Sequence, residues 1–320
     1  MKILANDGIS NSGKLKLEEA GYTVVTDKVE QEDLATAVND KNFEVVLVRS
    51  ATTVRKEVID ACSNLKLIGR GGVGMDNIDV SYAREAGRIV INTPASSSQS
   101  VAELVMGKLY SISRFLNSSY KNMESGDFKT LKKEFGKGVE LRGKTLGIIG
   151  FGRIGQSLAS YAIGSGMRVV AIGIDAETVN IDLPLLHGIN PVSVSIYVST
   201  DLHGNLPQMD FISLHVPKQD NGSAVFGEKE FSLMKHGVRI VNAARGGVID
   251  EDALLKALDD GKVAAAGLDV FENEPSPKKA LLSHPRIACT PHIGAATVEA
   301  QDRIGEELAD LIISNFGRFN

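Results

Sequence analysis

Short apolar runs alternate with longer amphipathic stretches along most of this 320-residue chain. Such an alternation predicts repeated strand–helix–strand units and parallel β-sheets. In the first third of the chain, we expect strands at residues 2–4, 22–25, 43–48, 65–68 and 89–91. The polar stretches between them, including residues 14–20 and 55–61, carry the Glu and Lys residues typical of surface helices.

A second series of strands follows a change of pattern near residue 94. Residues 94–100 are polar and typical of a loop, and Ser100 and Glu103 have the spacing of a capping box at a helix start. Later strands are expected at residues 146–149, 168–172, 211–216, 239–242, 263–268 and 287–289. A last helix is expected over residues 296–313, and the pattern alone does not decide on which domain it packs.

The two series predict an α/β protein with two Rossmann-like domains, each built on a parallel sheet. A chain of 320 residues is long enough for two hydrophobic cores. We expect residues 1–95 and 296–320 to form a first, discontinuous domain that is interrupted by a second domain over residues 96–295.

Composition and charge narrow the range of partners. The formal net charge is −5 and charges of both signs are interspersed, so we expect no nucleic-acid binding. The chain has neither an apolar run of membrane-spanning length nor a secretory signal pattern, which predicts a cytoplasmic protein without a membrane partner. The only cysteines, Cys62 and Cys289, lack the spacing of metal ligands, so no metal site is expected.

A glycine-rich turn is the strongest local motif. Gly150, Gly152 and Gly155 follow an apolar strand and open a helix that contains Arg153 and Ile154. In the dinucleotide-binding motif, the first glycine allows a tight turn and the second allows the backbone to approach the pyrophosphate. The third lets helix and strand pack closely, with the phosphates at the helix N-terminus. The second domain is therefore expected to be a NAD-binding Rossmann domain, and the first to bind the substrate.

An acidic residue is expected about twenty positions later, where it would bind the adenosine ribose. Asp175 has this separation from Gly155, although the strand before it ends near Gly173, the position where such an acid usually stands. A solvated loop aspartate is the alternative interpretation of Asp175. The segment offers no Arg or Lys for a 2′-phosphate, and Glu177 would repel one, so NAD is favoured over NADP.

Several motifs together resemble the D-isomer-specific 2-hydroxyacid dehydrogenases. They lie in the order and at the intervals of that family, over essentially the whole chain: residues 150–155, 214–217, 242–251, 267–275 and 290–296. Two N-terminal segments, residues 48–52 and 69–77, are most similar to the family's phosphoglycerate dehydrogenase branch. The resemblance implies a homodimer or higher homo-oligomer.

The resemblance also implies a catalytic set of Arg245, Glu274 and His292, and the chemistry suits these residue types. The planar Arg245 guanidinium can bind a carboxylate and the adjacent oxygen. His292 can take the hydroxyl proton and return it, and Glu274 can orient its imidazole. Each residue also has a non-catalytic interpretation. Glu274 could be a surface charge and His292 a structural histidine, whereas an arginine at the end of an apolar strand, such as Arg245, is harder to explain without a function.

Other positions that match the family pattern have implied supporting roles. The nicotinamide and its ribose would be lined by His215, Val216, Ala243, Ala244, Asp269 and Gly294. From the first domain, Gly72 and Val73 would offer backbone amides, which implies an active site in the cleft between the two domains. Arg49 and Ser50 would bind a distal phosphate of the substrate. A basic stretch could contribute from a neighbouring subunit or simply form a solvated helix face: Lys129, Lys132, Lys133 and Lys137.

The expected reaction is the NAD-dependent oxidation of 3-phospho-D-glycerate to 3-phosphohydroxypyruvate, in serine biosynthesis. A hydroxypyruvate or glyoxylate reductase of the same family is the nearest alternative, and an NADH-sensing, corepressor-like binding protein is the alternative from another class. The chain ends soon after its last helix, so we expect no C-terminal regulatory module. Residues 188–207 are richer in β-formers than the helix that the family pattern implies there.

Overall fold

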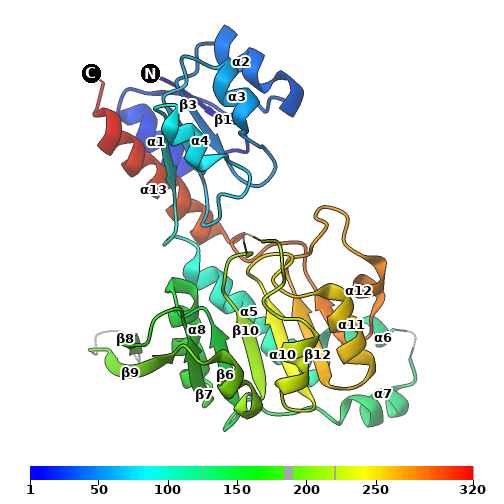
Figure 1. Ribbon diagram of the computed structural model, residues 1–320. Coiled ribbons are helices and arrows are strands. Elements are labelled where there is room, and N and C mark those ends of the chain that lie inside the picture. The colour runs from blue at the N-terminus through cyan, green and yellow to red at the C-terminus, as the bar shows by residue number, and fades with distance from the viewer. Residues whose placement is uncertain (125, 184–189, 220, 320) are drawn as a thin grey trace. The chain divides into compact units, whose positions relative to one another are not determined.

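The computed structural model describes residues 1–124, 126–183, 190–219 and 221–319. Its backbone divides into two units, each of which has its own sheet (Figure 1). Unit 1 comprises Met1–Ser98 and Ala295–Asn320, and unit 2 comprises Gln99–Gly294. The sequence placed these divisions at residues 95/96 and 295/296, a few residues away in each case.

Unit 1 alternates strands and helices and ends with a helix from the other end of the chain. Its described elements are β1 (Lys2–Ala5), α1 (Asn11–Glu19), β2 (Thr23–Val25), the 3-10 helix η1 (Gln31–Asp33), α2 (Leu34–Asp40), β3 (Val45–Val48), α3 (Lys56–Ala61), β4 (Leu67–Arg70), α4 (Val80–Glu85), β5 (Ile89–Asn92) and α13 (Val298–Phe316).

The sheet of unit 1 contains five parallel strands among the described residues, in the order β2-β1-β3-β4-β5. All four residues of β3 are buried, as is usual for a central parallel strand that is covered on both faces. Alternate side chains along the strands enter two cores: Val46 and Val48 pack with α2, α3 and α4, whereas Val45 and Leu47 pack with α1 and α13. The sheet therefore lies between two helical layers.

Unit 2 is built in the same way, with a longer chain. Its described elements are α5 (Ser98–Arg114, whose first residue belongs to unit 1), α6 (Leu116–Asn122), α7 (Phe128–Phe135), β6 (Thr145–Ile149), α8 (Arg153–Gly164), β7 (Arg168–Ile172), β8 (Glu177–Leu183), β9 (Val192–Ser199), α9 (Leu202–Asn205), η2 (Leu206–Gln208), β10 (Phe211–Leu214), α10 (Glu228–Leu233), β11 (Val238–Asn242), α11 (Glu251–Asp259), β12 (Val263–Leu268), α12 (Lys279–Ser283) and β13 (Ile287–Cys289).

In the part of unit 2 that is described, eight strands form one sheet in the order β13-β12-β11-β10-β6-β7-β9-β8. Every pairing is parallel except that between β8 and β9. Helices α5 and α8 cover one face of this sheet, and α10, α11 and α12 cover the other. The predicted fold class, two Rossmann-like α/β units with parallel sheets, is confirmed.

A β-hairpin replaces the helix that the family pattern implies after β7. Strands β8 and β9 pair antiparallel at one edge of the sheet (Figure 1), and β9 continues the parallel sheet beside β7. In β9 the side chains of Val194, Ile196 and Val198 pack in the core while their neighbours point outward, which is the two-residue period of a strand. The β-formers noted in this stretch are thus explained, although Gly188 and Ile189 lie outside the described residues.

The predicted capping box at Ser100 is wrong. Helix α5 begins at Ser98, which places Ser100 inside its first turn. The Glu103 carboxylate accepts hydrogen bonds from the Tyr161 hydroxyl at 2.9 Å and from the Gln99 side chain at 3.3 Å. Glu103 therefore connects α5 to a residue of α8.

The last helix, α13, belongs to unit 1. It packs against α1, and Ile304, Leu308 and Ile312 are buried in the core that these two helices share with the sheet (Figure 1). Among the helices of the described residues, none combines the length and the apolar character required to span a membrane.

Candidate functional site

The glycine-rich turn connects β6 to α8. Gly150 has a φ of +95°, in the region that only glycine adopts readily. A side chain there would also lie 2.5 Å from the His215 carbonyl oxygen, because the residues after β10 pass directly beside the turn. At Gly155 a Cβ would lie 2.5 Å from the Gly150 oxygen, so the close packing of helix and strand predicted at this glycine is confirmed.

Gly152 differs from its two neighbours in the motif. A Cβ at this position would meet nothing within 4 Å, so the turn leaves open space in front of the first turn of α8. Gly152 is the N-cap of this 12-residue helix and provides no side chain to cap it. The backbone amides of Arg153, Ile154 and Gly155 start the helix at its positive end, an arrangement that suits a pyrophosphate. The residues present therefore fit a dinucleotide.

His215 lies beside this turn. Its backbone N–H donates to Ile149 at 2.7 Å, and its Nε2 is 2.9 Å from the Ser213 hydroxyl. Burial lowers the pKa of His215 to about 4, so its imidazole is neutral at physiological pH. Its buried Nδ1 has no hydrogen-bond partner among the described residues, which leaves one polar atom for a ligand next to Val216.

At the adenosine end of the motif, Asp175 is exposed and lies three residues beyond the end of β7. Gly173 follows the strand directly, and a Cβ there would lie 2.7 Å from the Val198 side chain of β9. The hairpin thus explains why a side chain is disfavoured at the position where the acid usually stands. Asp175 precedes β8 by two residues and stays a predicted ribose ligand.

Arg245 is carried by a tight turn after β11. The buried Asn242, at the end of that strand, donates from its side chain to the Arg245 carbonyl at 2.9 Å and accepts from the Ala244 N–H at 3.0 Å. The guanidinium donates to the Ala244 carbonyl at 2.6 Å. The next residue must be glycine, because a Cβ on Gly246 would lie 1.8 Å from the Phe271 oxygen.

Glu274 and His292 form a hydrogen-bonded pair. Glu274 Oε2 is 2.8 Å from His292 Nδ1, and the other carboxylate oxygen accepts from the Phe271 N–H at 2.9 Å. Their side chains are 35% and 39% exposed, so both can meet a small molecule. Because Nδ1 faces Glu274, His292 Nε2 is the nitrogen available for proton transfer.

A cavity of about 410 Å³ adjoins this pair. Its lining is mainly apolar and contains Phe271, Pro275, Leu282 and Pro291, with no Lys or Arg among the described residues. A phosphate would therefore have to be held elsewhere, because an apolar wall does not compensate its charge.

Asp269 holds the loop on which His292 stands. Its side chain is buried, and its carboxylate accepts from the Thr290 hydroxyl at 2.5 Å and from the N–H groups of Ile293 at 3.0 Å and Gly294 at 2.8 Å. His292 itself has a φ of +52° and donates its N–H to the Asp269 carbonyl at 2.8 Å. Asp269 is thus an anchor of the 290–294 loop.

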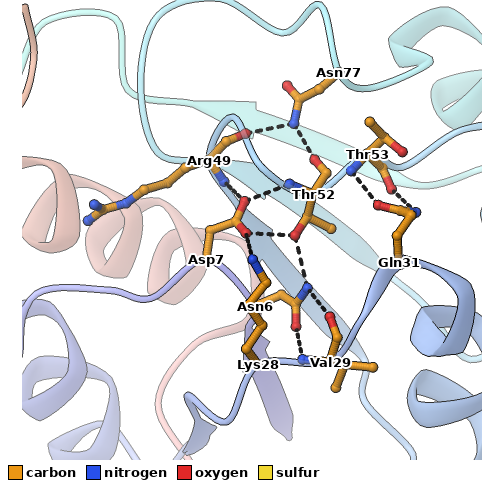
Figure 2. Close-up of polar contacts among 9 residues, drawn as sticks. All are labelled: Asn6, Asp7, Lys28, Val29, Gln31, Arg49, Thr52, Thr53 and Asn77. Carbon is orange, nitrogen blue, oxygen red and sulfur yellow. Dashed lines mark hydrogen bonds and ion pairs between the residues drawn. The ribbon is translucent and has the colours of Figure 1, made fainter. Parts of the chain in front are cut away.

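In unit 1, Arg49 follows β3 and belongs to a loop held by Asp7 (Figure 2). The Asp7 carboxylate is 4% exposed and accepts from the N–H groups of Arg49 at 2.7 Å and Thr52 at 3.0 Å, and from the Thr52 hydroxyl at 2.7 Å. Asn77 donates to the carbonyls of Arg49 and Thr52, both at 2.6 Å. The Arg49 guanidinium points away from this network in Figure 2.

The other predicted residues of unit 1 lie at neighbouring strand ends. Ser50 is exposed beside Arg49, and Val48 is in register with Arg70 at the end of β4. Arg70 donates to the Gly71 carbonyl at 3.3 Å, and its guanidinium occupies the place that a Cβ on Gly72 would take. Val73 is exposed directly afterwards.

The basic residues Lys129, Lys132 and Lys133 lie on α7 in unit 2, with Lys137 just after it, and all are exposed. Helix α7 is short and contacts α6. The large apolar residues Leu116 and Tyr120 of α6 are exposed as well. The structure therefore places them on a surface, where both interpretations made from the sequence stay open.

The sequence predicted which residues would act on the ligands and missed those that hold them in place. Asn242, Asp7 and Asn77 were not predicted as site residues, and Asp269 was predicted only as a cofactor contact. A polar residue in or just after a buried strand was the available signal, because such a group must be hydrogen-bonded when it is buried. Asn242 ends β11 and Asp7 follows β1.

Comparisons with known proteins agree on one family. A model of the D-isomer specific 2-hydroxyacid dehydrogenase NAD binding domain matches residues 106–294. The chain is 40% identical over 320 residues to a hydroxypyruvate reductase of Thermotoga maritima, covering 99% of this chain and 98% of that relative. It is 41% identical over 312 residues to a D-3-phosphoglycerate dehydrogenase of Methanocaldococcus jannaschii, covering 98% of this chain and 57% of that relative.

Among solved structures, a glyoxylate reductase from Paecilomyes thermophila matches with a TM-score of 0.82 and 28% identity, over 100% of this chain and 97% of that chain. The chain spans about half the length of the D-3-phosphoglycerate dehydrogenases that it matches.

Proposed function

This chain belongs to the D-isomer specific 2-hydroxyacid dehydrogenases, and we propose that within this family it oxidises 3-phospho-D-glycerate to 3-phosphohydroxypyruvate. It is an oxidoreductase whose cofactor is NAD. The observation that supports a phosphorylated substrate is the setting of Arg49. Arg49 is half-buried on a loop that three side chains hold in place, and its guanidinium is directed away from them.

A held guanidinium suits a phosphate, because planar, charge-assisted hydrogen bonds to phosphate oxygens are strong and directional. Burial lowers the pKa of Arg49 from its usual value while the Asp7 carboxylate raises it, and an arginine remains protonated in any such setting. We propose that Arg49 and Ser50 bind the phosphate, since the cavity beside Glu274 and His292 has an apolar lining without Lys or Arg.

In the proposed reaction, three side chains of unit 2 have separate roles. Arg245 binds the substrate carboxylate and so fixes the C2 carbon. His292 Nε2 takes the hydroxyl proton, and Glu274 on Nδ1 keeps the ring in one orientation and stabilises the imidazolium that results. The glycine turn between β6 and α8 would hold NAD, which would supply the acceptor for the hydride of C2. In the reverse direction His292 returns the proton to the carbonyl oxygen.

Substrate preference in the purified protein is the direct test. We expect Arg49→Gln to raise KM for 3-phospho-D-glycerate roughly 10- to 100-fold, the worth of one charged hydrogen-bond pair, with little change for unphosphorylated D-glycerate. Arg55→Gln is the matched control, because Arg55 lies in the same unit and pairs with Asp79 on its surface. Turnover of hydroxypyruvate or glycolate without turnover of the phosphorylated substrate would refute the assignment.

A hydroxypyruvate reductase is the second candidate, and one observation favours it. The relative from Thermotoga maritima that carries this name matches over nearly its whole length. Such an enzyme has no phosphate to bind, so Arg49→Gln would leave its KM for hydroxypyruvate within about twofold. The same variant therefore separates the two candidates.

The catalytic roles are tested by His292→Ala, which removes the proposed base. We expect kcat to fall roughly 100- to 10,000-fold, the usual worth of a general base, while NADH still binds. Steady-state rates and NADH fluorescence measure the two properties separately. Unchanged turnover would sink the assignment of His292.

We also propose that the chain forms a homodimer through α6 and α7. Large apolar side chains are exposed on this segment of unit 2: Leu116 at 52%, Tyr120 at 86%, Met123 at 51% and Phe128 at 65%. Apolar residues gathered on a short segment are typical of protein interfaces. Sedimentation of the wild type and of Tyr120→Ser with Phe128→Ser tests this, with a monomer expected for the double variant.

A further inference from the structure

Lys108 is a buried lysine to which the reaction described above assigns no role. It lies in α5 and is 4% exposed. Its Nζ donates to the carbonyl oxygens of Leu268 at 3.0 Å and Ala288 at 3.1 Å. Leu268 is the last residue of β12 and Ala288 lies in the neighbouring strand β13. One ammonium group thus joins the carboxyl ends of two parallel strands from the helix that covers them.

The packing of α5 does not itself require a lysine. The buried residues around it on the helix are apolar: Val105, Leu109 and Ile112. The helix approaches β12 so closely that a Cβ on Gly267 would lie 3.0 Å from the Lys108 Cβ. An apolar side chain of similar length would fill this place at a lower desolvation penalty, because a buried charge is strongly disfavoured unless it is compensated.

The buried charge of Lys108 is compensated by residues at the carboxyl ends of the two strands. Burial lowers the pKa of Lys108 to about 8, against the opposing effect of Asp269 and of Cys289. Asp269 follows β12 directly, and Cys289 ends β13. The pKa of the Cys289 thiol is raised by burial, and the nearby charges of Lys108 and of Lys121 in α6 oppose this shift only in part. Lys108 therefore carries a positive charge at neutral pH, next to the buried Asp269 carboxylate.

We propose that Lys108 is a positioning residue that fixes the 290–294 loop, and with it His292, on the ends of β12 and β13. The carbonyls that Lys108 binds lie just before the two residues whose side chains anchor the loop. Asp269 follows Leu268, and Thr290 lies two residues after Ala288. The Asp269 carboxylate accepts a hydrogen bond from the Thr290 hydroxyl. Asp269 then binds Thr290, Ile293 and Gly294. Removing the ammonium takes one donor from each of the two carbonyls, although that of Leu268 still accepts from the Thr290 N–H at 2.9 Å. It also leaves the Asp269 charge without its nearby cation.

The importance of Lys108 for turnover rests on the proposed function, because it matters to the reaction only if His292 transfers the proton. Two variants separate its contributions. Lys108→Met removes the charge and the donors with little change of volume, and Lys108→Gln removes the charge but keeps N–H donors. Lys262→Met is the matched control, because Lys262 precedes β12 in sequence and also donates to a backbone carbonyl, that of Ser232 at 3.0 Å, but near the surface.

Amide hydrogen exchange, read by mass spectrometry on peptides that cover residues 289–294, measures the order of the loop without reference to catalysis. We expect exchange there to be at least about tenfold faster in Lys108→Met than in the wild type, the effect of roughly 1.4 kcal/mol of lost local stability. Peptides from β6 and α8 should keep their wild-type rates, as should every peptide of Lys262→Met.

Steady-state kinetics are then measured on the same proteins. Because Lys108 does not contact the turn of Arg245, we expect kcat to fall about tenfold or more and KM for the hydroxy acid to change less than about threefold.

The outcomes are distinguishable. Wild-type exchange in the 289–294 peptides of Lys108→Met would overturn the inference, whatever the rates. Faster exchange with an unchanged kcat would uphold the positioning of the loop and would instead contradict the catalytic role proposed for His292. If Lys108→Met does not fold, Lys108→Gln is judged by the same criteria, because it still removes the charge next to Asp269.

Discussion

At the scale of single residues, His292 stands out because its backbone and its side chain are both constrained. A φ of +52° is uncommon for a residue other than glycine and costs about 1 kcal/mol or more unless the surroundings hold it. Here the holding group is Asp269, which binds the loop through its carbonyl and both carboxylate oxygens. The imidazole orientation is set separately, by Glu274.

Removing the Glu274 charge tests that second constraint. In Glu274→Gln the hydrogen bond to Nδ1 can persist, but the charge that stabilises the imidazolium is lost. We expect kcat/KM to fall roughly 10- to 100-fold, at the lower end of the range for general acid–base catalysis. Glu272→Gln in the same loop is the control, because Glu272 contacts Glu251 and Lys278. Equal rates for the two variants would contradict an orienting role.

Lys108 gives a prediction about stability and pH. Its pKa is lowered in the folded protein, from 10.5 to about 8, so the unfolded chain binds more protons between these two values. Below pH 8 the folded state bears the full unfavourable burial of the charge. As pH rises from 8 to 10.5 this penalty disappears, and the contribution of Lys108 to the free energy of unfolding rises by about 3 kcal/mol.

Urea unfolding of the wild type and of Lys108→Met across this pH range measures that contribution as the difference between the two proteins. The difference should shift in favour of the wild type as pH increases. A constant difference would mean that Lys108 keeps an ordinary pKa in the folded state.

At the scale of elements, the β6–α8 turn uses similar glycines for different purposes. Gly155 allows two elements to touch, whereas Gly152 leaves space for a ligand. The β8–β9 hairpin restricts the residue that follows β7 at the same end of the sheet. Val198 of β9 occupies the space that a side chain on Gly173 would need.

The two glycines therefore predict opposite results on substitution by alanine. Gly155→Ala would place a Cβ 2.5 Å from the Gly150 oxygen, and we expect it to destabilise unit 2 by roughly 1–3 kcal/mol, as overpacking does. Gly152→Ala should leave stability nearly unchanged and weaken NADH binding about tenfold or more. Thermal unfolding and NADH fluorescence measure the two effects. Loss of stability without loss of affinity in Gly152→Ala would contradict the open pyrophosphate site.

At the scale of the whole molecule, each unit has its own cores, although the chain passes from unit 1 to unit 2 and back. The first and last segments of the chain meet in unit 1, where α13 packs on α1. A Cβ on Gly13 of α1 would lie 2.4 Å from the backbone of Gly305 in α13, so the two helices touch at glycines. The stability of unit 1 therefore depends on residues from both chain ends.

Leu308→Ala tests this dependence, because Leu308 is 3% exposed in the core that α13 shares with the sheet. We expect a loss of roughly 2–5 kcal/mol, typical of a cavity in a core. Hydrogen exchange should show the loss in β1, β3 and α1 and not in β6 or β10. Val298→Ala, 77% exposed on the same helix, should change stability by less than about 0.5 kcal/mol.

The sequence by itself determined the alternation of strands and helices, the glycine turn and the residues that carry reactive groups. These features are local, because a strand buried on both faces, a glycine before a helix and an arginine after an apolar run are all visible within a few positions. The tertiary structure alone decided that α5 begins at Ser98 and that a hairpin extends the sheet.

Long-range contacts also decided which polar residues hold the site. Lys108 and Asp269 are separated by most of unit 2 in sequence, and only the packing of α5 against β12 and β13 brings them near each other. A lysine among the apolar positions of α5 was a signal in the sequence, but its partners are backbone carbonyls, which every residue has. Their identity depends on which strand ends the folded chain brings to that place.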